Sequence, residues 1–129
     1  MGAINGDRGL GSLYIGPDPE WAHGTLAEAL GEPVEVVGRQ DDSLFHGPDS
    51  YDLVFLDLTG AVDQSWQRTI SRLWQQDLRV VVISPKPNWE EARWAMRSGA
   101  VGYAEKTTVV LELAEEIAKA KDTPAHHPR

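Results

Sequence analysis

Residues 51–58 read YDLVFLDL, and this stretch carries the clearest signal of the architecture of the chain. Its apolar part, residues 53–56, is short and continuous, which is typical of a parallel strand that is buried on both faces of a sheet. Asp57 follows at once. Because parallel α/β sheets place their functional sites at the carboxyl ends of their strands, Asp57 is a candidate site residue.

Two later apolar runs end in a similar way. Residues 80–83 are followed by Ser84, and residues 101–104 lead to Lys106. In a parallel sheet, a carboxylate, a hydroxyl group and an ammonium group then converge at one edge. We expect Asp57, Ser84 and Lys106 to meet there.

The rest of the chain alternates strand-like and helix-like patterns. Strands are expected at 13–15, 34–37, 53–56, 80–83 and 101–104, and helices at 19–30, 62–76, 89–99 and 107–121. Asp18 is placed to cap the first helix, and Asn88 with Glu91 forms a variant of the capping box. Residues 38–50 are polar and leave room for one helical turn at most.

This order of elements predicts an α/β fold with right-handed crossovers. The simplest architecture is a flavodoxin-like, doubly wound, five-stranded parallel sheet in the order 2-1-3-4-5. Helices cover both of its faces, and the second helix is short or degenerate.

Tryptophans lie on both sides of the helix expected over 89–99. The apolar stripe predicted to face the core consists of Trp89, Ala92, Ala95, Met96 and Gly99. At about 100° per residue, Trp94 falls opposite this stripe, and we expect it to be exposed. An exposed tryptophan is either an interface residue or lies flat against Arg93 or Arg97 as a cation–π contact, and both interpretations stay open.

Length and charge limit the classes of function. The chain has 129 residues, no cysteine and a formal net charge of -8. We expect one domain over 13–121, a flexible N-terminal segment over 1–12 and a flexible tail or linker over 122–129. The acidic balance argues against direct binding to nucleic acid or to an anionic membrane. With no membrane-spanning run and no signal peptide in the sequence, a soluble cytoplasmic protein is expected.

Three stretches carry a family pattern: residues 51–58, the run that ends on Ser84, and residues 98–106, which read SGAVGYAEK. Together they resemble the receiver domain of bacterial two-component response regulators. In that family an aspartate at the end of the third strand takes a phosphoryl group from a phosphohistidine of a sensor kinase, and the domain then changes its contacts with partners. The resemblance implies a signal-transduction module of a phosphorelay, and not an enzyme.

The resemblance gives each strand-end residue a role. Asp57 matches the phosphoacceptor, while Lys106 and Ser84 match the cation and the hydroxyl that stabilise charge on the phosphoryl oxygens. Tyr103 matches the aromatic switch residue, whose ring turns inward when the hydroxyl residue is drawn to the phosphate.

The resemblance also implies partners, namely a sensor histidine kinase or another signalling protein. Receivers dimerise or meet partners through their fourth helix, fifth strand and fifth helix, which here are residues 89–99, 101–104 and 107–121. A homodimer through this face is one implied arrangement, and Trp94 is a candidate interface residue. The makeup of residues 122–129 suits a linker to an output domain.

One part of the family pattern is missing. Response regulators carry two adjacent carboxylates after the first strand, and these positions read Gly16-Pro17 here. In the family this pair holds Mg²⁺ with the acceptor and a backbone carbonyl two residues beyond it, which would be Asp57 and Thr59. Mg²⁺ depends on carboxylates, so it is expected only if the site functions. Asp18 lies one position too late, and it either caps the helix or reaches the metal site.

Two classes of function stay open. The first is a receiver that keeps Asp57 as a candidate phosphoacceptor but regulates through protein contacts, independently of phosphorylation. The reason is that the metal site lacks its pair of carboxylates. Asp57 and Lys106 are then an ion pair at the strand ends. The second is a small flavodoxin-like ligand-binding protein or enzyme that uses the same crevice. We expect the first.

Overall fold

The computed structural model describes residues 11–38, 51–61 and 63–123. The strands are β1 (Gly11–Ile15), β2 (Glu35–Val37), β3 (Tyr51–Asp57), β4 (Arg79–Ser84) and β5 (Gly102–Glu105). The helices are α2 (Pro19–Trp21), the π-helical η2 (Ala22–Leu26), α3 (Ala27–Leu30), α4 (Ser65–Gln75), α5 (Trp89–Ser98) and α6 (Val110–Asp122). The predictions for residues 1–10, 39–50 and 124–129 lie outside the described residues.

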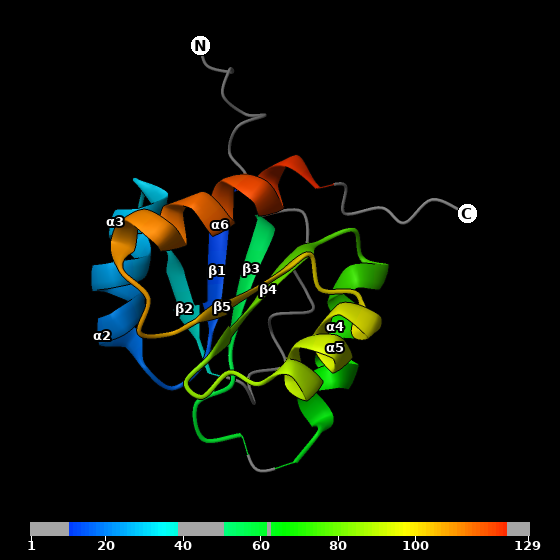
Figure 1. Cartoon of the computed structure of the whole chain (residues 1–129). Helices are drawn as coiled ribbons and strands as arrows, with labels where there is room; N and C mark the ends of the chain where they lie inside the picture. The colour runs from blue at the N-terminus through cyan, green and yellow to red at the C-terminus, as the bar shows by residue number, and fades with distance from the viewer. Residues whose placement is uncertain (1–10, 39–50, 62, 124–129) are drawn as a thin grey trace.

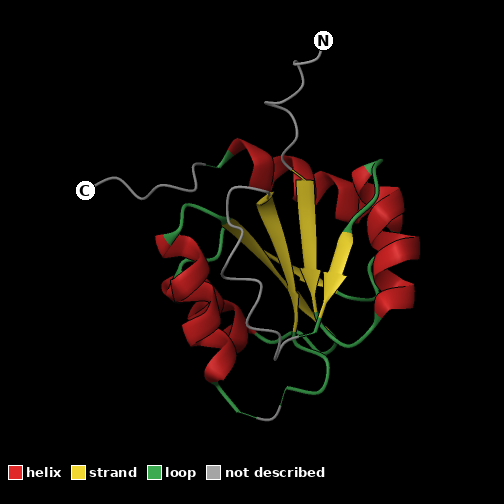
Figure 2. Cartoon of the chain, turned by 180° about the vertical axis from the view of Figure 1, so that it is seen from behind, coloured by secondary structure: helices red, strands yellow, loops and turns green. Residues whose placement is uncertain are grey.

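The strands form one parallel sheet in the order β2-β1-β3-β4-β5. The predicted flavodoxin-like order is therefore confirmed. All strands point the same way and end at the same edge of the sheet (Figure 2). β3 is the central strand, and its residues 53–56 are buried as expected.

Helices cover both faces of the sheet (Figure 1). On one face, α4 and α5 contribute Trp66, Ile70, Leu73 and Ala95 to the core. On the other face, η2 and α6 contribute Ala22, Leu26, Leu113, Ile117 and Ala120. Because successive strand residues point to opposite faces, β3 supplies both cores, with Val54 in the first and Phe55 in the second. In the part of the chain that is described, no helix is both long and apolar enough to cross a membrane.

The helical segment over 19–30 begins and ends as predicted. Oδ1 of Asp18 accepts a hydrogen bond from the backbone N–H of Trp21 at 3.1 Å, and Pro19 occupies the first turn. Gly31, with φ of 76°, ends the segment. Its middle part, η2, is π-helical instead of α-helical. Gly24 lies in this stretch, and glycine weakens an α-helix.

α5 packs differently from the prediction. Ala95 is buried, but Trp89 and Met96 of the expected inner stripe are 76% and 50% exposed. The C-terminal end of α5 approaches α4 closely, since a Cβ atom on Gly99 would lie 2.9 Å from Cγ of Trp74 near the end of α4. In packing this tight, the buried side of this end of α5 accepts a small residue such as Ala95 and not a large one. The predicted stripe was wrong for its two largest members.

Candidate functional site

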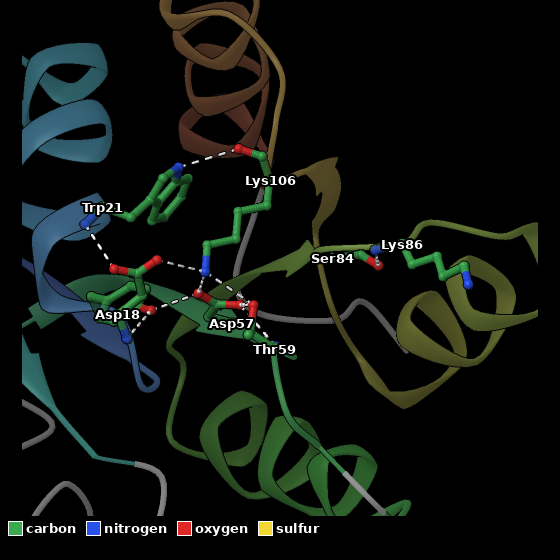
Figure 3. Close-up of polar contacts among 8 residues, drawn as sticks. Asp18, Trp21, Asp57, Thr59, Ser84, Lys86 and Lys106 are labelled. Atoms are coloured by element: carbon green, nitrogen blue, oxygen red, sulfur yellow. Dashed lines mark hydrogen bonds and ion pairs between the residues drawn. The ribbon is translucent and has the colours of Figure 1, made fainter.

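Asp57 and Lys106 meet at the carboxyl edge of the sheet (Figure 3). Asp57 is the last residue of β3, and Lys106 directly follows β5. The lysine side chain reaches across the end of β4, and its Nζ lies 3.0 Å from Oδ2 of Asp57. The strand order brings these two charges together, although their positions in the sequence are far apart.

The carboxylate of Asp57 is buried and surrounded by hydrogen-bond donors. Its exposed fraction is 0%. Oδ1 accepts from the backbone N–H of Thr59 at 2.9 Å and from the hydroxyl of Thr59 at 2.7 Å. Oδ2 accepts from the hydroxyl of Tyr14 at 2.5 Å and from Lys106. A carboxylate offers about four lone-pair positions, so donors of the chain itself fill the group.

Tyr14 was not among the predicted site residues. It is fully buried, and its hydroxyl also accepts a hydrogen bond from the backbone N–H of Asp18 at 3.0 Å. Burial, followed by the hydrogen bond to Asp57, raises the pKa of Tyr14 far above its ordinary value. A signal was present in the sequence, because a phenol in a buried strand needs an acceptor. Tyr14 pairs in register with Phe55, and Asp57 comes two residues later on the same face of β3.

Asp18 fills a structural role and also reaches the cluster. While Oδ1 caps the helix, Oδ2 lies 2.9 Å from Nζ of Lys106. The hydrogen bond from Lys106, and then the N–H of Trp21, lower the pKa of Asp18. Burial alone lowers the pKa of Lys106, but its bonds to Asp18 and Asp57 outweigh burial and raise it. Lys106 is therefore charged and shared between two carboxylates.

Trp21 covers the cluster from the first helical segment. Its indole N–H donates to the backbone oxygen of Lys106 at 3.2 Å. The centre of its ring lies 5.8 Å from Nζ of Lys106 and 5.9 Å from the ring of Tyr14. This contact ties the start of the helical segment to the connection between β5 and α6, above the strand ends.

Ser84 does not join the cluster. Its hydroxyl donates to Oε1 of Glu91 at 2.6 Å, and Figure 3 shows it turned away from Asp57 and Lys106. The predicted meeting of all three residues was wrong, because α5 supplies Ser84 with a different acceptor. The hydroxyl that contacts Lys106 is that of Thr59, whose Oγ1 accepts from Nζ at 3.0 Å.

Tyr103 belongs to the same second network as Ser84. Its half-buried hydroxyl donates to Oε1 of Glu91 at 2.6 Å and accepts from the backbone N–H of Asn88 at 3.2 Å. Burial, and then the bond to Glu91, raise the pKa of Tyr103. The sequence pattern predicts a helix cap here, and Asn88 does cap α5 at 2.8 Å. The carboxylate of Glu91 instead holds Ser84 and Tyr103 together.

The residues at the strand ends do not fit Mg²⁺, which prefers carboxylates and retained waters. A Cβ atom on Gly16 would lie 2.7 Å from both Cβ of Asp57 and the hydroxyl oxygen of Tyr14. No carboxylate side chain therefore fits at this position, and Oδ2 of Asp57 already binds a phenol and an ammonium group. Within the described ranges, no three His, Cys, Asp or Glu side chains are grouped so that they could hold a metal ion.

Replacing Tyr14 by phenylalanine tests its bond to Asp57. The buried carboxylate loses a donor, so we expect the free energy of unfolding to fall by about 1.5–3 kcal/mol. Because the pKa of Tyr14 is raised in the folded protein, its contribution is present below the ordinary value of 10.0 and is lost as pH rises above it. Measured by urea unfolding, the free energies of unfolding of the unaltered chain and of Tyr14→Phe should therefore become more similar above pH 10.0.

Tyr51→Phe is the matched control for this variant. It removes an exposed hydrogen bond to Glu35 and should cost less than about 1 kcal/mol at neutral pH. Equal stability of Tyr14→Phe and the unaltered chain would show that the Tyr14 hydroxyl does not support Asp57.

Neither a family model nor a curated protein sequence matches this chain. Solved structures of low sequence identity are similar to it. A response regulator from Thermotoga maritima has a TM-score of 0.70 at 19% identity, over 88% of this chain and 99% of that one. A second similar structure is a response regulator protein from Burkholderia pseudomallei, solved with a phosphorylated aspartic acid, a calcium ion and citrate. Its TM-score is 0.65 at 23% identity, over 88% of this chain and 69% of that one.

A third similar structure is the signal receiver domain of a modulated diguanylate cyclase from Desulfovibrio desulfuricans. Its TM-score is 0.62 at 27% identity, over 86% of this chain and 93% of that one. The strand order and the helices on both faces agree with these likenesses. The chain has the fold of a response regulator receiver domain.

Proposed function

We propose that this chain is a signal receiver module that acts through protein contacts, independently of phosphorylation at Asp57, and is not an enzyme. The fold supports the receiver role. The observation that carries the proposal is the state of the Asp57 carboxylate. It is fully buried, and Tyr14, Thr59 and Lys106 are bound to its two oxygens.

Two features of this site argue against phosphoryl transfer to Asp57. A carboxylate nucleophile needs a lone pair that faces the incoming phosphorus atom. Such an approach requires the Tyr14 hydroxyl to leave Oδ2 of Asp57. The reaction also needs positive charge beside the phosphoryl oxygens. The ammonium group of Lys106 is shared with Asp18. The side chains of Tyr14 and Asp57, which surround Gly16, leave no room there for a side chain that could bind a metal ion.

The second network supports the same proposal. Ser84 and Tyr103 both donate to Oε1 of Glu91 at 2.6 Å. Their positions are thus fixed by an acceptor that belongs to the chain and not by a phosphoryl group. We therefore expect these bonds to stabilise the surface around Tyr103 in the arrangement through which the chain contacts other signalling proteins.

Treatment with acetyl phosphate or beryllofluoride in the presence of Mg²⁺ tests the proposal. We expect no gain of a phosphoryl group in the intact mass, and no change in the backbone chemical shifts of Asp57, Ser84 or Tyr103. A receiver domain with two carboxylates after its first strand, treated in parallel, is the positive control. A mass gain that disappears in Asp57→Asn would contradict the proposal.

A further inference from the structure

The first helical segment, residues 19–30, holds one extra residue in its middle turn. Both of its ends are α-helical, since the N–H of Ala22 bonds to the carbonyl of Asp18 at 3.2 Å and that of Gly31 bonds to Ala27 at 2.9 Å. Between them, the N–H of Ala27 reaches back five residues to the carbonyl of Ala22. Such an i→i+5 turn encloses one residue more than an α-helical turn, and π-helical turns of this kind are frequent at functional sites.

The two parts of this segment are held in different ways. Ala22 and Leu26 are fully buried against the sheet, and α3 packs against α6. α2 contributes no buried residue. Its contacts are with Lys106, whose Nζ lies 2.9 Å from Oδ2 of Asp18 and whose backbone oxygen accepts from the indole of Trp21 at 3.2 Å (Figure 3). The start of the segment is thus bound to the cluster at the strand ends, while the rest is bound to the core.

α-Helical bonding through the whole segment would move its start. The N–H of Leu26 would then bond to the carbonyl of Ala22, and residues 18–21 would turn by about 100° about the helix axis and shift by about 1.5 Å along it. This movement breaks both contacts with Lys106 and the 3.0 Å bond from the backbone of Asp18 to the hydroxyl of Tyr14. It also turns other side chains of the segment outward. We call the observed bonding pattern the π register and the alternative the α register.

The middle turn has only weak preferences of its own. Gly24 and Thr25 are poor helix formers. A Cβ atom on Gly24 would meet nothing within 4 Å, so packing does not require a glycine there. The N–H of Ala27 is shared between the carbonyls of Ala22 and Gly24, on either side of the carbonyl of His23 that an α-helix would use. The contacts at the start of the segment therefore decide between the two registers.

We propose that the segment 19–30 is a register switch that couples the cluster at the strand ends to the outer surface of this segment. The π register holds Asp18 and Trp21 on Lys106, and the α register releases them. The inference rests on the proposed function, because it supplies a means of changing a contact surface without phosphorylation. By linkage, an event that draws Lys106 away favours the α register, and anything that stabilises the α register releases Lys106.

The double variant Asp18→Asn/Trp21→Phe tests this coupling. Asparagine caps a helix as well as aspartate does, and phenylalanine keeps an aromatic ring beside Tyr14. The variant therefore loses the ion pair and the indole hydrogen bond to Lys106 but keeps the helix start. We expect the ratio of the π register to the α register to fall by about tenfold or more.

The readout is the hydrogen-bond partner of the Ala22 carbonyl. In the ¹³C,¹⁵N-labelled full chain, couplings measured across hydrogen bonds identify which N–H is bound to it. This partner should be Ala27 in the unaltered chain and Leu26 in the double variant. Glu20→Gln, at an exposed position of the same segment, is the matched control and should keep Ala27 as the partner.

Deletion of Gly24 is the second control. It removes the extra residue, so an ordinary α-helix can keep both ends of the segment in place, and no second register is left. In this background, Asp18→Asn/Trp21→Phe should change the chemical shifts of the replaced residues and their neighbours only. In the full chain, the same double variant should also shift the backbone signals of residues 23–26.

The outcomes separate this switch from the proposed function. The switch is overturned if Ala27 stays bound to Ala22 in the double variant, if Leu26 is already the partner in the unaltered chain, or if the double variant loses all helical couplings over 22–27. The last result would mean that the segment unfolds instead of changing register. Phosphorylation of Asp57 would overturn the proposed function and leave the result on the register unchanged. Failure of the register change with an unphosphorylated Asp57 would overturn the switch alone.

Discussion

Replacing Lys106 by methionine is expected to lower the free energy of unfolding by about 3–5 kcal/mol. Methionine keeps most of the side-chain volume but removes the charge that compensates Asp57. The carboxylate would then stay at 0% exposure without its ammonium partner, while the hydroxyl and amide donors of Tyr14 and Thr59 remain. Leaving one partner of a buried pair unpaired costs far more than the pair contributes. Urea unfolding followed by circular dichroism measures the loss.

Two further variants separate charge from packing at this site. Asp57→Asn combined with Lys106→Met removes both charges, and it should recover part of the stability lost in the single variant. Lys119→Met is the control, because its side chain is 74% exposed beside Glu116. It should change stability by less than about 0.5 kcal/mol. A Lys106→Met chain as stable as the unaltered one would show that the lysine does not compensate Asp57.

The sheet and the meeting of Asp57 with Lys106 follow from local sequence features. Buried parallel strands leave a clear signal, because both faces need apolar residues, and each run ends at a polar residue. Once the strand order is fixed, the ends of β3 and β5 must lie at the same edge. A long lysine side chain then spans the end of β4 without further requirements.

The parts that the sequence did not predict depend on contacts between elements. Ser84 has two directions open to it at the end of β4, and Glu91 on α5 decides between them. Tyr14 needs the register of β1 against β3 before its partner Asp57 can be named. At the C-terminal end of α5, the residues that can be buried depend on how closely the helix approaches α4. Apolar spacing reports which residues share a face, but it does not report how much room that face has.

Placing a side chain at Gly16 is expected to be among the most destabilising changes at this edge of the sheet. A Cβ atom there would lie 2.7 Å from Cβ of Asp57, and 2.7 and 2.9 Å from Oη and Cζ of Tyr14. All these atoms are buried and held by the strands. Gly16→Ala should therefore cost about 3 kcal/mol, at the upper end of overpacking effects. Gly16→Asp should cost more, because it also puts a second carboxylate beside a buried one.

This expectation means that the acidic pair of receivers cannot be restored by substitution. Pro17→Asp, at the exposed neighbouring position, is the matched control and should change stability by less than about 0.5 kcal/mol. Urea unfolding compares the variants. A folded Gly16→Asp chain that binds Mg²⁺ and accepts a phosphoryl group at Asp57 would contradict this steric account.

A double variant tests whether Tyr14 and Gly16 depend on each other. Tyr14→Leu removes the phenol atoms that a Cβ at position 16 would meet, but it leaves the contact with Cβ of Asp57. Tyr14→Leu combined with Gly16→Ala should therefore lose about 1 kcal/mol less than the sum of the two single losses. Strict additivity would show that the two positions are independent. Coupling would mean that the tyrosine beside Asp57 and the missing carboxylate after β1 have one steric cause.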